Sequence, residues 1–305
     1  MTGEGTEIRA FDEAALAQAT DLILAGQLVA VPTETVYGLA ADATNGEAVA
    51  RIYAAKGRPS FNPLIVHVPD LASAEKLGEF DAAARRLAEA HWPGPLTLVV
   101  PLLDDAGISS LVTAGLPSIA LRVPAHPVMQ ALLRATGRPL AAPSANASGR
   151  ISPTTAQHVF ASLSGRIALI LDGGPTERGL ESTIVAVTDG RLRLLRPGPL
   201  LIEGAERTGS GDIEAPGMMA SHYAPTKPVR LNATQRRDGE WLIGFGAITG
   251  DDTLSASGDL TEAAARLFAC LHRADAQPVD AIAVAPVPDE GLGTAINDRL
   301  RRAAA

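Results

Sequence analysis

The sequence predicts an α/β protein, because segments with a helical spacing of apolar residues alternate with short apolar runs typical of buried strands. The helical spacing occurs in Asp12–Ala25 and Asn45–Ala55, and apolar runs occur in Leu28–Val31 and Leu64–Val66. The 305 residues are enough for two domains, and a hydrophobic content of 46% is sufficient for a sizeable core.

Composition narrows the class of protein. The net charge of -8 argues against a molecule that attracts nucleic acid as a whole, so any anion site must be a local cluster of cations. The single cysteine, Cys270, excludes an internal disulfide and a cysteine metal cluster, and we expect it to be a packing residue. No apolar run is long enough to span a bilayer, and Met1–Ala10 lacks a signal-peptide pattern. We therefore expect a cytoplasmic protein with no membrane contact.

The first helix, Asp12–Ala25, has Asp12 as its cap and Gly26 at its end. The strand Leu28–Val31 follows and runs into the polar segment Pro32–Gly38, which we expect to be a loop. Two interpretations of this loop are open. It is a turn whose polar groups satisfy their own backbone, or a polar rim at the carboxyl end of a strand, where open α/β sheets bind ligands.

Two cations follow the helix Asn45–Ala55. Lys56 and Arg58 flank Gly57 and precede Pro59, so we expect both side chains to leave the helix end into an irregular loop. A lysine and an arginine side by side at a sheet edge suit a phosphate-bearing ligand, since one offers a point charge and the other a planar fork. The alternative is a solvated helix end whose dipole is offset by the two cations.

The central part of the chain continues the alternation. We expect helices over Asp70–Leu77, Asp81–His91, His126–Thr136 and Pro153–Leu163, and strands over Leu96–Val100, Ser118–Pro124, Pro139–Pro143 and Ile167–Leu171. Arg122 lies within an apolar strand and therefore requires a partner, which is either a bound anion or an acidic residue. Ser144 and Asn146 are two apart on an extended segment and so point the same way, which suits a phosphate but also an ordinary turn.

The last third contains a hairpin, a linker and a smaller unit. Glu181–Val185 returns through Arg191–Leu195, with Asp189-Gly190 as the turn. We expect three parts, a catalytic domain over 1–205, a linker or flap over 206–228 and a small α/β domain over 229–305. The elements expected in the small domain are parallel strands over Trp241–Phe245 and Ala281–Ala285, a capping box at Asp259–Glu262 and a last helix over Gly293–Arg302.

Taken together, the polar and cationic motifs resemble the L-threonylcarbamoyladenylate synthase family. The likeness is to its long form, a YrdC-type catalytic domain followed by a small Rossmann-like domain. The matching stretches are Pro32–Leu39, Lys56-x-Arg58-Pro59, Asn62–His67, Trp92–Thr97, Ala142–Asn146, Glu181–Thr183, Leu195–Gly198, Pro216–Met218, His222–Pro225 and Ala295–Leu300. The linker departs from the family, because Met219-Ala220-Ser221 stands where Lys-Tyr-Arg is commoner, which puts basic contacts from the flap in doubt.

The resemblance implies a twisted, open, mixed α/β sheet with a positively charged cavity. It implies a nucleotidyltransferase that makes threonylcarbamoyl-AMP and pyrophosphate from L-threonine, bicarbonate and ATP, for threonylcarbamoyladenosine modification of tRNA. Mg²⁺ would be held by the phosphates, and no residue is assigned as a metal ligand. The partners would be the downstream tRNA threonylcarbamoyl transferase proteins, with contact to tRNA left open. Two other functions stay open, a double-stranded RNA or tRNA-binding module and a carbamoyl transferase acting on another acceptor.

The resemblance also assigns residues. Those expected around threonine are Thr35, His67, Arg122, Ala142 and Ser182. Those expected around ATP are Arg58, Asn62, Ser118, Ser144, Ser152, Arg196, His222 and Tyr223. Activity is expected to depend on Lys56, Arg58, Ser144 and Asn146. For His67 we favour orientation of the substrate over general base catalysis, and we expect Met218–Pro225 to close over the nucleotide.

Overall fold

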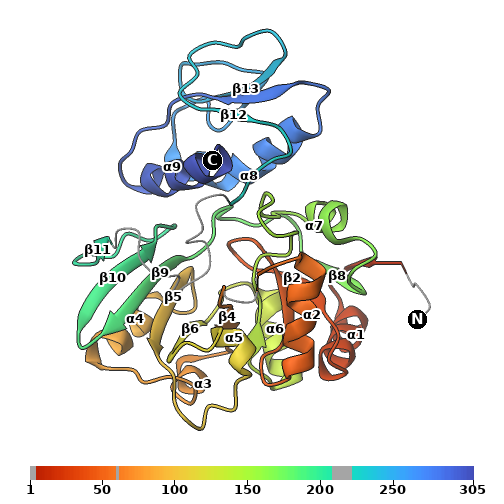
Figure 1. Cartoon of the computed structure of the whole chain (residues 1–305), viewed down its shortest axis with the longest axis vertical. Coiled ribbons are helices and arrows are strands. Elements are labelled where there is room, and N and C mark those ends of the chain that lie inside the picture. The colour runs from red at the N-terminus through yellow and green to blue at the C-terminus, as the bar shows by residue number, and fades with distance from the viewer. Residues whose placement is uncertain (1–4, 60–61, 208–221) are drawn as a thin grey trace.

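Two β-sheets organise the chain in the computed structural model, which describes residues 5–59, 62–207 and 222–305 (Figure 1). Within these residues the larger sheet has eleven strands in the order β1-β8-β2-β3-β7-β4-β6-β5-β9-β10-β11. Its strands are β1 Glu7–Ala10, β2 Val29–Pro32, β3 Tyr37–Asp42, β4 Ile65–His67, β5 Leu96–Pro101, β6 Ser118–Arg122, β7 Leu140–Ala141, β8 Leu169–Asp172, β9 Thr183–Thr188, β10 Arg191–Arg196 and β11 Glu206–Arg207. The helices that accompany it are α1 Glu13–Leu24, α2 Gly46–Lys56, α3 Leu71–Ala74, α4 Ala82–His91, α5 Ser110–Thr113, α6 Pro127–Thr136 and α7 Ala156–Leu163.

The larger sheet is mixed, as predicted. The pairs β4–β6 and β5–β9 are parallel, whereas β2–β3, β5–β6 and β9–β10 are antiparallel. Helices α1 and α6 cover one face through a core that includes Ile23, Val29 and Met129. Helices α2, α4, α5 and α7 contribute to the larger core on the other face, which includes Leu39 and Ile52.

One part of the sheet carries only a thin apolar layer. Ile65, Val99, Ala120, Ile184, Ala186 and Leu195 form a separate small cluster that comes entirely from strands β4, β5, β6, β9 and β10. Since no described helix contributes to this cluster, this face is left to line a cavity, and Ile65 is one of the cavity residues.

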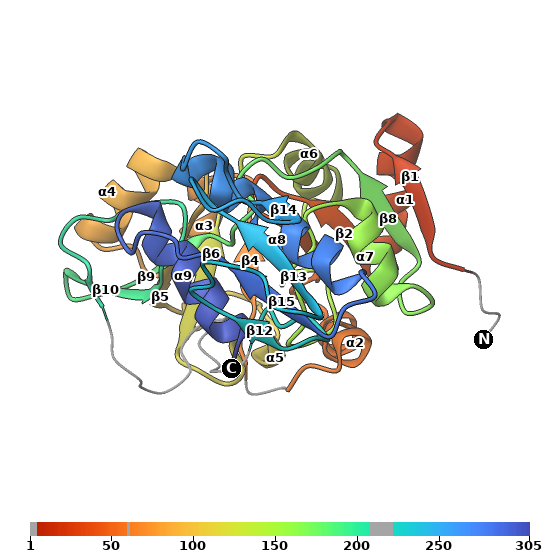
Figure 2. The ribbon, with the colours of Figure 1, turned by 90° about the horizontal axis from the view of Figure 1, so that it is seen from above.

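The C-terminal unit has its own four-stranded sheet in the order β12-β15-β13-β14, in which all pairs are parallel. Its elements are β12 Val229–Arg230, β13 Glu240–Gly244, β14 Asp252–Thr253, α8 Leu260–Asp275, β15 Ala281–Val284 and α9 Leu292–Ala303. Figures 1 and 2 show α8 and α9 between this sheet and the larger unit. Ile151 and Leu180 belong to the same apolar cluster as Phe268 and Ile296, so the two units share buried contacts. The division at residues 205 and 229 stays a prediction.

Several expected elements needed correction. Pro32–Gly38 is not entirely a loop, because Tyr37 begins β3, which pairs with β2 in an antiparallel hairpin. The capping box at Asp259 is only half formed. Asp259 accepts from the backbone N–H of Glu262 at 2.7 Å, but the Glu262 carboxylate turns to the hydroxyl of Ser255 at 2.6 Å.

The described residues contain no helix long and apolar enough to cross a membrane.

Candidate active site

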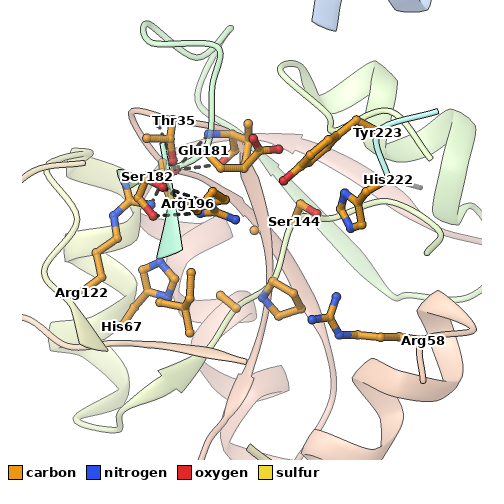
Figure 3. A pocket seen from close by; sticks show the side chains of 16 residues that line it. Thr35, Arg58, His67, Arg122, Ser144, Glu181, Ser182, Arg196, His222 and Tyr223 are labelled. Atoms are coloured by element: carbon orange, nitrogen blue, oxygen red, sulfur yellow. Dashed lines mark hydrogen bonds between the residues drawn. The ribbon is translucent and has the colours of Figure 1, made fainter. Parts of the chain in front are cut away.

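A pocket opens on the part of the larger sheet that no described helix covers (Figure 3). It is built from segments far apart in sequence, which meet where strands end or begin. Its lining is Thr33, Thr35, Val36, Gly38, Arg58, Ile65, His67, Arg122, Ala142, Pro143, Ser144, Glu181, Ser182, Arg196, His222 and Tyr223. In Figure 3, Arg122 and His67 lie on one side of this pocket, Arg58 on the other, and Arg196 between them.

The structure brings together ten of the residues expected at the site and leaves five out of the lining. Those in the lining are Thr35, Arg58, His67, Arg122, Ala142, Ser144, Ser182, Arg196, His222 and Tyr223. Those outside it are Lys56, Asn62, Ser118, Asn146 and Ser152. Of the expected flap, 218–221 lie outside the described residues, whereas His222 and Tyr223 are buried in the pocket wall.

Arg122 has an acidic partner, one of the two alternatives that its sequence context implied. Its Nη2 lies 2.6 Å from Oε1 of Glu34, its Nη1 donates to Oγ1 of Thr35 at 3.0 Å, and its Nε donates to the carbonyl of Gly94 at 3.2 Å. Burial would raise the pKa of Glu34, but the charge and hydrogen bonds of Arg122 outweigh it and hold that pKa below its usual value. The guanidinium is therefore held rigidly beside the cavity.

Arg196 and Arg58 both donate hydrogen bonds to backbone carbonyls. Nη2 of Arg196 donates to the carbonyl of Ser182 at 3.0 Å and to its hydroxyl at 3.1 Å. Arg58 donates to the carbonyls of Asn62 at 3.3 Å and Pro63 at 3.1 Å. Burial lowers the pKa of Arg58 to about 10, so this side chain still carries its charge at neutral pH. A buried cation held by neutral carbonyls is suited to an anionic ligand.

Lys56 closes the helix rather than lying in the loop, which corrects part of the expectation, but it lies near Arg58, since burial and then the charge of Arg58 lower the pKa of Lys56 well below its usual value. It is the last residue of α2, and Gly57 ends the helix with a φ of 59°. The Lys56 ammonium is buried and donates to the carbonyls of Ser144 and Asn146. Lys56 thereby fixes the segment that presents the Ser144 side chain to the pocket.

His67 and His222 are buried and neutral at neutral pH. Burial and then the charge of Arg122 lower the pKa of His67 to about 3. Burial also lowers the pKa of His222 to about 3, although the charge of Glu181 opposes the shift. An imidazole with such a pKa is a weak base, so the structure favours an orienting role for His67 over proton abstraction.

Glu181 lines the pocket, and reasoning from the sequence did not place it in the site. Its carboxylate accepts from the hydroxyl of Ser152 and pairs through Oε2 with Nε of Arg299 at 2.7 Å. One feature of the sequence could have indicated Glu181, which is its place directly before Ser182 in a matched motif. Its pairing with Arg299 on α9 could not be predicted from the sequence, because the two residues are far apart along the chain. Ser152 therefore contacts the pocket wall rather than the cavity.

A cavity with three buried arginines and several hydroxyls on an open α/β sheet defines a protein that binds small anionic molecules. Residues 21–198 match the Sua5_yciO_yrdC family model, described as "Telomere recombination", and residues 184–305 match "Threonylcarbamoyl-AMP synthase, C-terminal domain". The chain belongs to the Sua5/YciO/YrdC family, and its C-terminal part is the domain found in threonylcarbamoyl-AMP synthases.

Curated relatives agree with both matches. The chain is 43% identical to a threonylcarbamoyl-AMP synthase of Bacillus subtilis, over 95% of this chain and 92% of the relative. It is 40% identical to a threonylcarbamoyl-AMP synthase of Pyrococcus abyssi, over 93% and 92%. Among solved structures, P. abyssi Sua5 complexed with L-threonine is similar with a TM-score of 0.90 and 38% identity, over 98% of each chain.

Proposed function

We propose that this protein is a nucleotidyltransferase that forms L-threonylcarbamoyl-AMP and pyrophosphate from L-threonine, bicarbonate and ATP. The observation that carries the proposal is the meeting of Arg58, Arg122 and Arg196 in one buried pocket. The similarity to relatives named threonylcarbamoyl-AMP synthase and to a threonine-bound structure supports it. The product would serve threonylcarbamoyladenosine modification of tRNA.

The chemistry explains why such a pocket is needed. Bicarbonate loses hydroxide to give carbon dioxide, and the threonine amine attacks its carbon and releases a proton to give a carbamate. A carbamate oxygen then attacks the α-phosphorus of ATP, the bond to the β-phosphate oxygen breaks, and pyrophosphate leaves. Both partners of this second step are anions, so fixed cations lower the barrier, and fixed positions supply much of the remaining rate.

For threonine, we propose that Arg122 binds the carboxylate with the help of Thr35 and Ser182. A guanidinium suits a carboxylate because two parallel N–H bonds match its two oxygens. His67 would orient the amine or the hydroxyl as a neutral imidazole, and Ala142 would contribute backbone groups. The burial of Arg122 and its fixed geometry beside Thr35 support this assignment.

For ATP, we propose Arg58, Ser144 and Arg196 as the phosphate-binding groups, with His222 and Tyr223 against the nucleotide. All five line the pocket. Asn62, Ser118 and Ser152 are proposed as ATP-binding residues on the resemblance alone. Lys56 and Asn146 would act by positioning, since the Lys56 ammonium ties down the 144–146 segment.

The carboxylates in the described part of the pocket do not fit a cage for Mg²⁺. The described residues contain no cluster of three side chains suited to a metal ion, and the Glu34 and Glu181 carboxylates pair with arginines. We propose that Mg²⁺ enters with the phosphates of ATP, as is common for this ion. We further propose that the enzyme acts in the cytoplasm and hands its product to a tRNA threonylcarbamoyl transferase.

The test is pyrophosphate release from ATP with each substrate left out in turn. Release that requires both L-threonine and bicarbonate is the expected result. Release with other amines in place of threonine would instead indicate a carbamoyl transferase with another acceptor. Salt-dependent tRNA binding without threonine-dependent release would indicate an RNA-binding module.

A further inference from the structure

A row of buried charges connects the pocket wall to the C-terminal helix α9. Glu181 pairs with Arg299 at 2.7 Å, Arg299 pairs with Asp298 at 2.8 Å, and Asp298 pairs with Arg302 at 3.1 Å. Arg299 is fully buried, and its guanidinium carbon lies 5.2 Å from the centre of the Tyr223 ring. The row runs between a motif of the larger unit and a helix of the C-terminal unit, so it links the two at the candidate active site.

Glu181 is the point at which this row reaches the cavity. One of its oxygens accepts from Ser152 and the other from Arg299. Two cations act on its charge, Arg299 first and Arg196 second, and both help to hold the pKa of Glu181 below its usual value despite burial. The negative charge of Glu181 interacts with both arginines. The hydrogen bond to Arg299 fixes the position of the carboxylate and therefore how strongly it interacts with Arg196.

We propose that Arg299 is a positioning residue for nucleotide binding: it holds the Glu181 carboxylate toward α9 and so limits how far that charge neutralises Arg196 on the pocket wall. The proposal rests on the proposed function only for the identity of the nucleotide. The C-terminal unit would then have a specific role, because a residue of α9 adjusts the positive charge that Arg196 presents in the pocket.

The proposal predicts a specific effect of removing the guanidinium. In Arg299→Met, Glu181 keeps Arg196 as its remaining nearby cation and draws closer to it. Arg196 then offers less charge to the phosphates, so the KM for ATP should rise at least tenfold. The KM for threonine should stay within about threefold, because Arg122 pairs with Glu34 rather than with this row.

A double-mutant comparison separates positioning from stability. If Glu181 carries the effect, the Arg299→Met penalty on the KM for ATP should disappear when Glu181→Gln is already present. A purely structural role would instead lower the melting temperature and the active fraction, and leave the KM for ATP unchanged. Arg301→Met is the matched control, because Arg301 is on the same helix with its side chain 52% exposed.

The experiment measures KM for ATP and kcat for the full chain as wild type, R299M, E181Q, R299M/E181Q and R301M. Titration calorimetry measures ATP binding to the same proteins, so it tests the role of Arg299 even if the wild type releases no pyrophosphate. A wild type that releases no pyrophosphate would count against the proposed function but not against this role of Arg299. If R299M does not fold, Arg299→Lys replaces it, because an ammonium cannot reproduce the fork between Glu181 and Asp298. A KM and affinity for ATP within twofold of wild type in the Arg299 variant, or an equal penalty in both Glu181 backgrounds, would overturn the proposal.

Discussion

Nη2 of Arg122 lies 2.6 Å from Oε1 of Glu34, and Nη1 of the same side chain donates to Thr35 at 3.0 Å. Glu34 and Thr35 belong to one turn, and Arg122 is the last residue of β6. The turn therefore does two things at once. Its carboxylate supplies the counter-charge that a buried arginine needs, and its hydroxyl stands at the cavity beside that arginine.

Replacing Arg122 by lysine should weaken threonine binding. Lysine keeps the charge but cannot reach Glu34, Thr35 and a carboxylate with one planar fork. Loss of one charge-assisted hydrogen bond costs about 1.5–3 kcal/mol, so the KM for threonine should rise on the order of 10- to 100-fold while the KM for ATP changes little. Arg138→Lys is the control, since that side chain is exposed and 3.9 Å from Asp42. An unchanged KM for threonine in R122K would remove Arg122 from the threonine site.

Replacing Arg58 by methionine should cost turnover more than stability. Its guanidinium is held by two carbonyls and faces the cavity, so the main loss is a cation opposite the phosphates. We expect kcat/KM for ATP to fall at least 100-fold, about 2.7 kcal/mol of transition-state stabilisation. The melting temperature should stay within a few degrees. Arg86→Met, an exposed change on α4, should behave as wild type, and equal behaviour of the two variants would argue against a phosphate role for Arg58.

Replacing Lys56 by methionine should cost both stability and activity. The change leaves the carbonyls of Ser144 and Asn146 unsatisfied, at about 1–3 kcal/mol each, offset in part because a buried charge is also removed. Activity should fall through misplacement of Ser144, so kcat should drop more than ATP affinity. Urea unfolding and steady-state kinetics on the same sample measure both. A variant with a raised KM for ATP and an unchanged kcat would contradict the positioning role.

The contact between the two units should weaken in acid. His158 on α7 and His272 on α8 stack with ring centres 3.9 Å apart. Burial and the neighbouring imidazole and arginine lower the pKa of His158 to about 3, and burial lowers that of His272 to about 4. Both folded-state pKa values lie below the unfolded value near 6.5, so the unfolded chain binds more protons between these limits. The stabilisation is complete above about pH 6.5 and is lost progressively as the pH falls through the folded-state values of about 4 for His272 and about 3 for His158.

The measurement is the free energy of unfolding at pH values from 4.5 to 7.5. The variant His272→Gln should reduce the slope of stability against pH by about one proton. His91→Gln is the control, because His91 is a partly exposed residue at the end of α4, away from this stack. The same slope in wild type and H272Q would show that the stacked pair does not contribute.

The sequence predicted the longer helices and most long strands, since caps and apolar spacing are local properties, but it did not predict the four-residue helix α5. Asp12 caps α1 and Asn45 caps α2 as their residue types indicate. Strand β3 was not predicted, because it follows β2 across a short turn whose polar residues suggested a loop. The short strand β1 depends on a distant partner, β8, and no local pattern indicates it.

The site was predicted in outline by motif resemblance, but its internal contacts were not. The pairing of Glu181 with Arg299 joins residues 118 positions apart, and the pairing of Arg122 with Glu34 joins residues 88 apart. Spacing along the chain carries no information on such contacts. For the same reason the sequence did not reveal that the Lys56 side chain reaches the Ser144 segment of another loop.

The most direct test of the account is the identity of the product. The protein is incubated with ATP, L-threonine and ¹³C-labelled bicarbonate, and the quenched mixture is examined by mass spectrometry. The account predicts threonylcarbamoyl-AMP carrying a single ¹³C, formed together with pyrophosphate and only when all three substrates are present. Pyrophosphate without any labelled adenylate would contradict it.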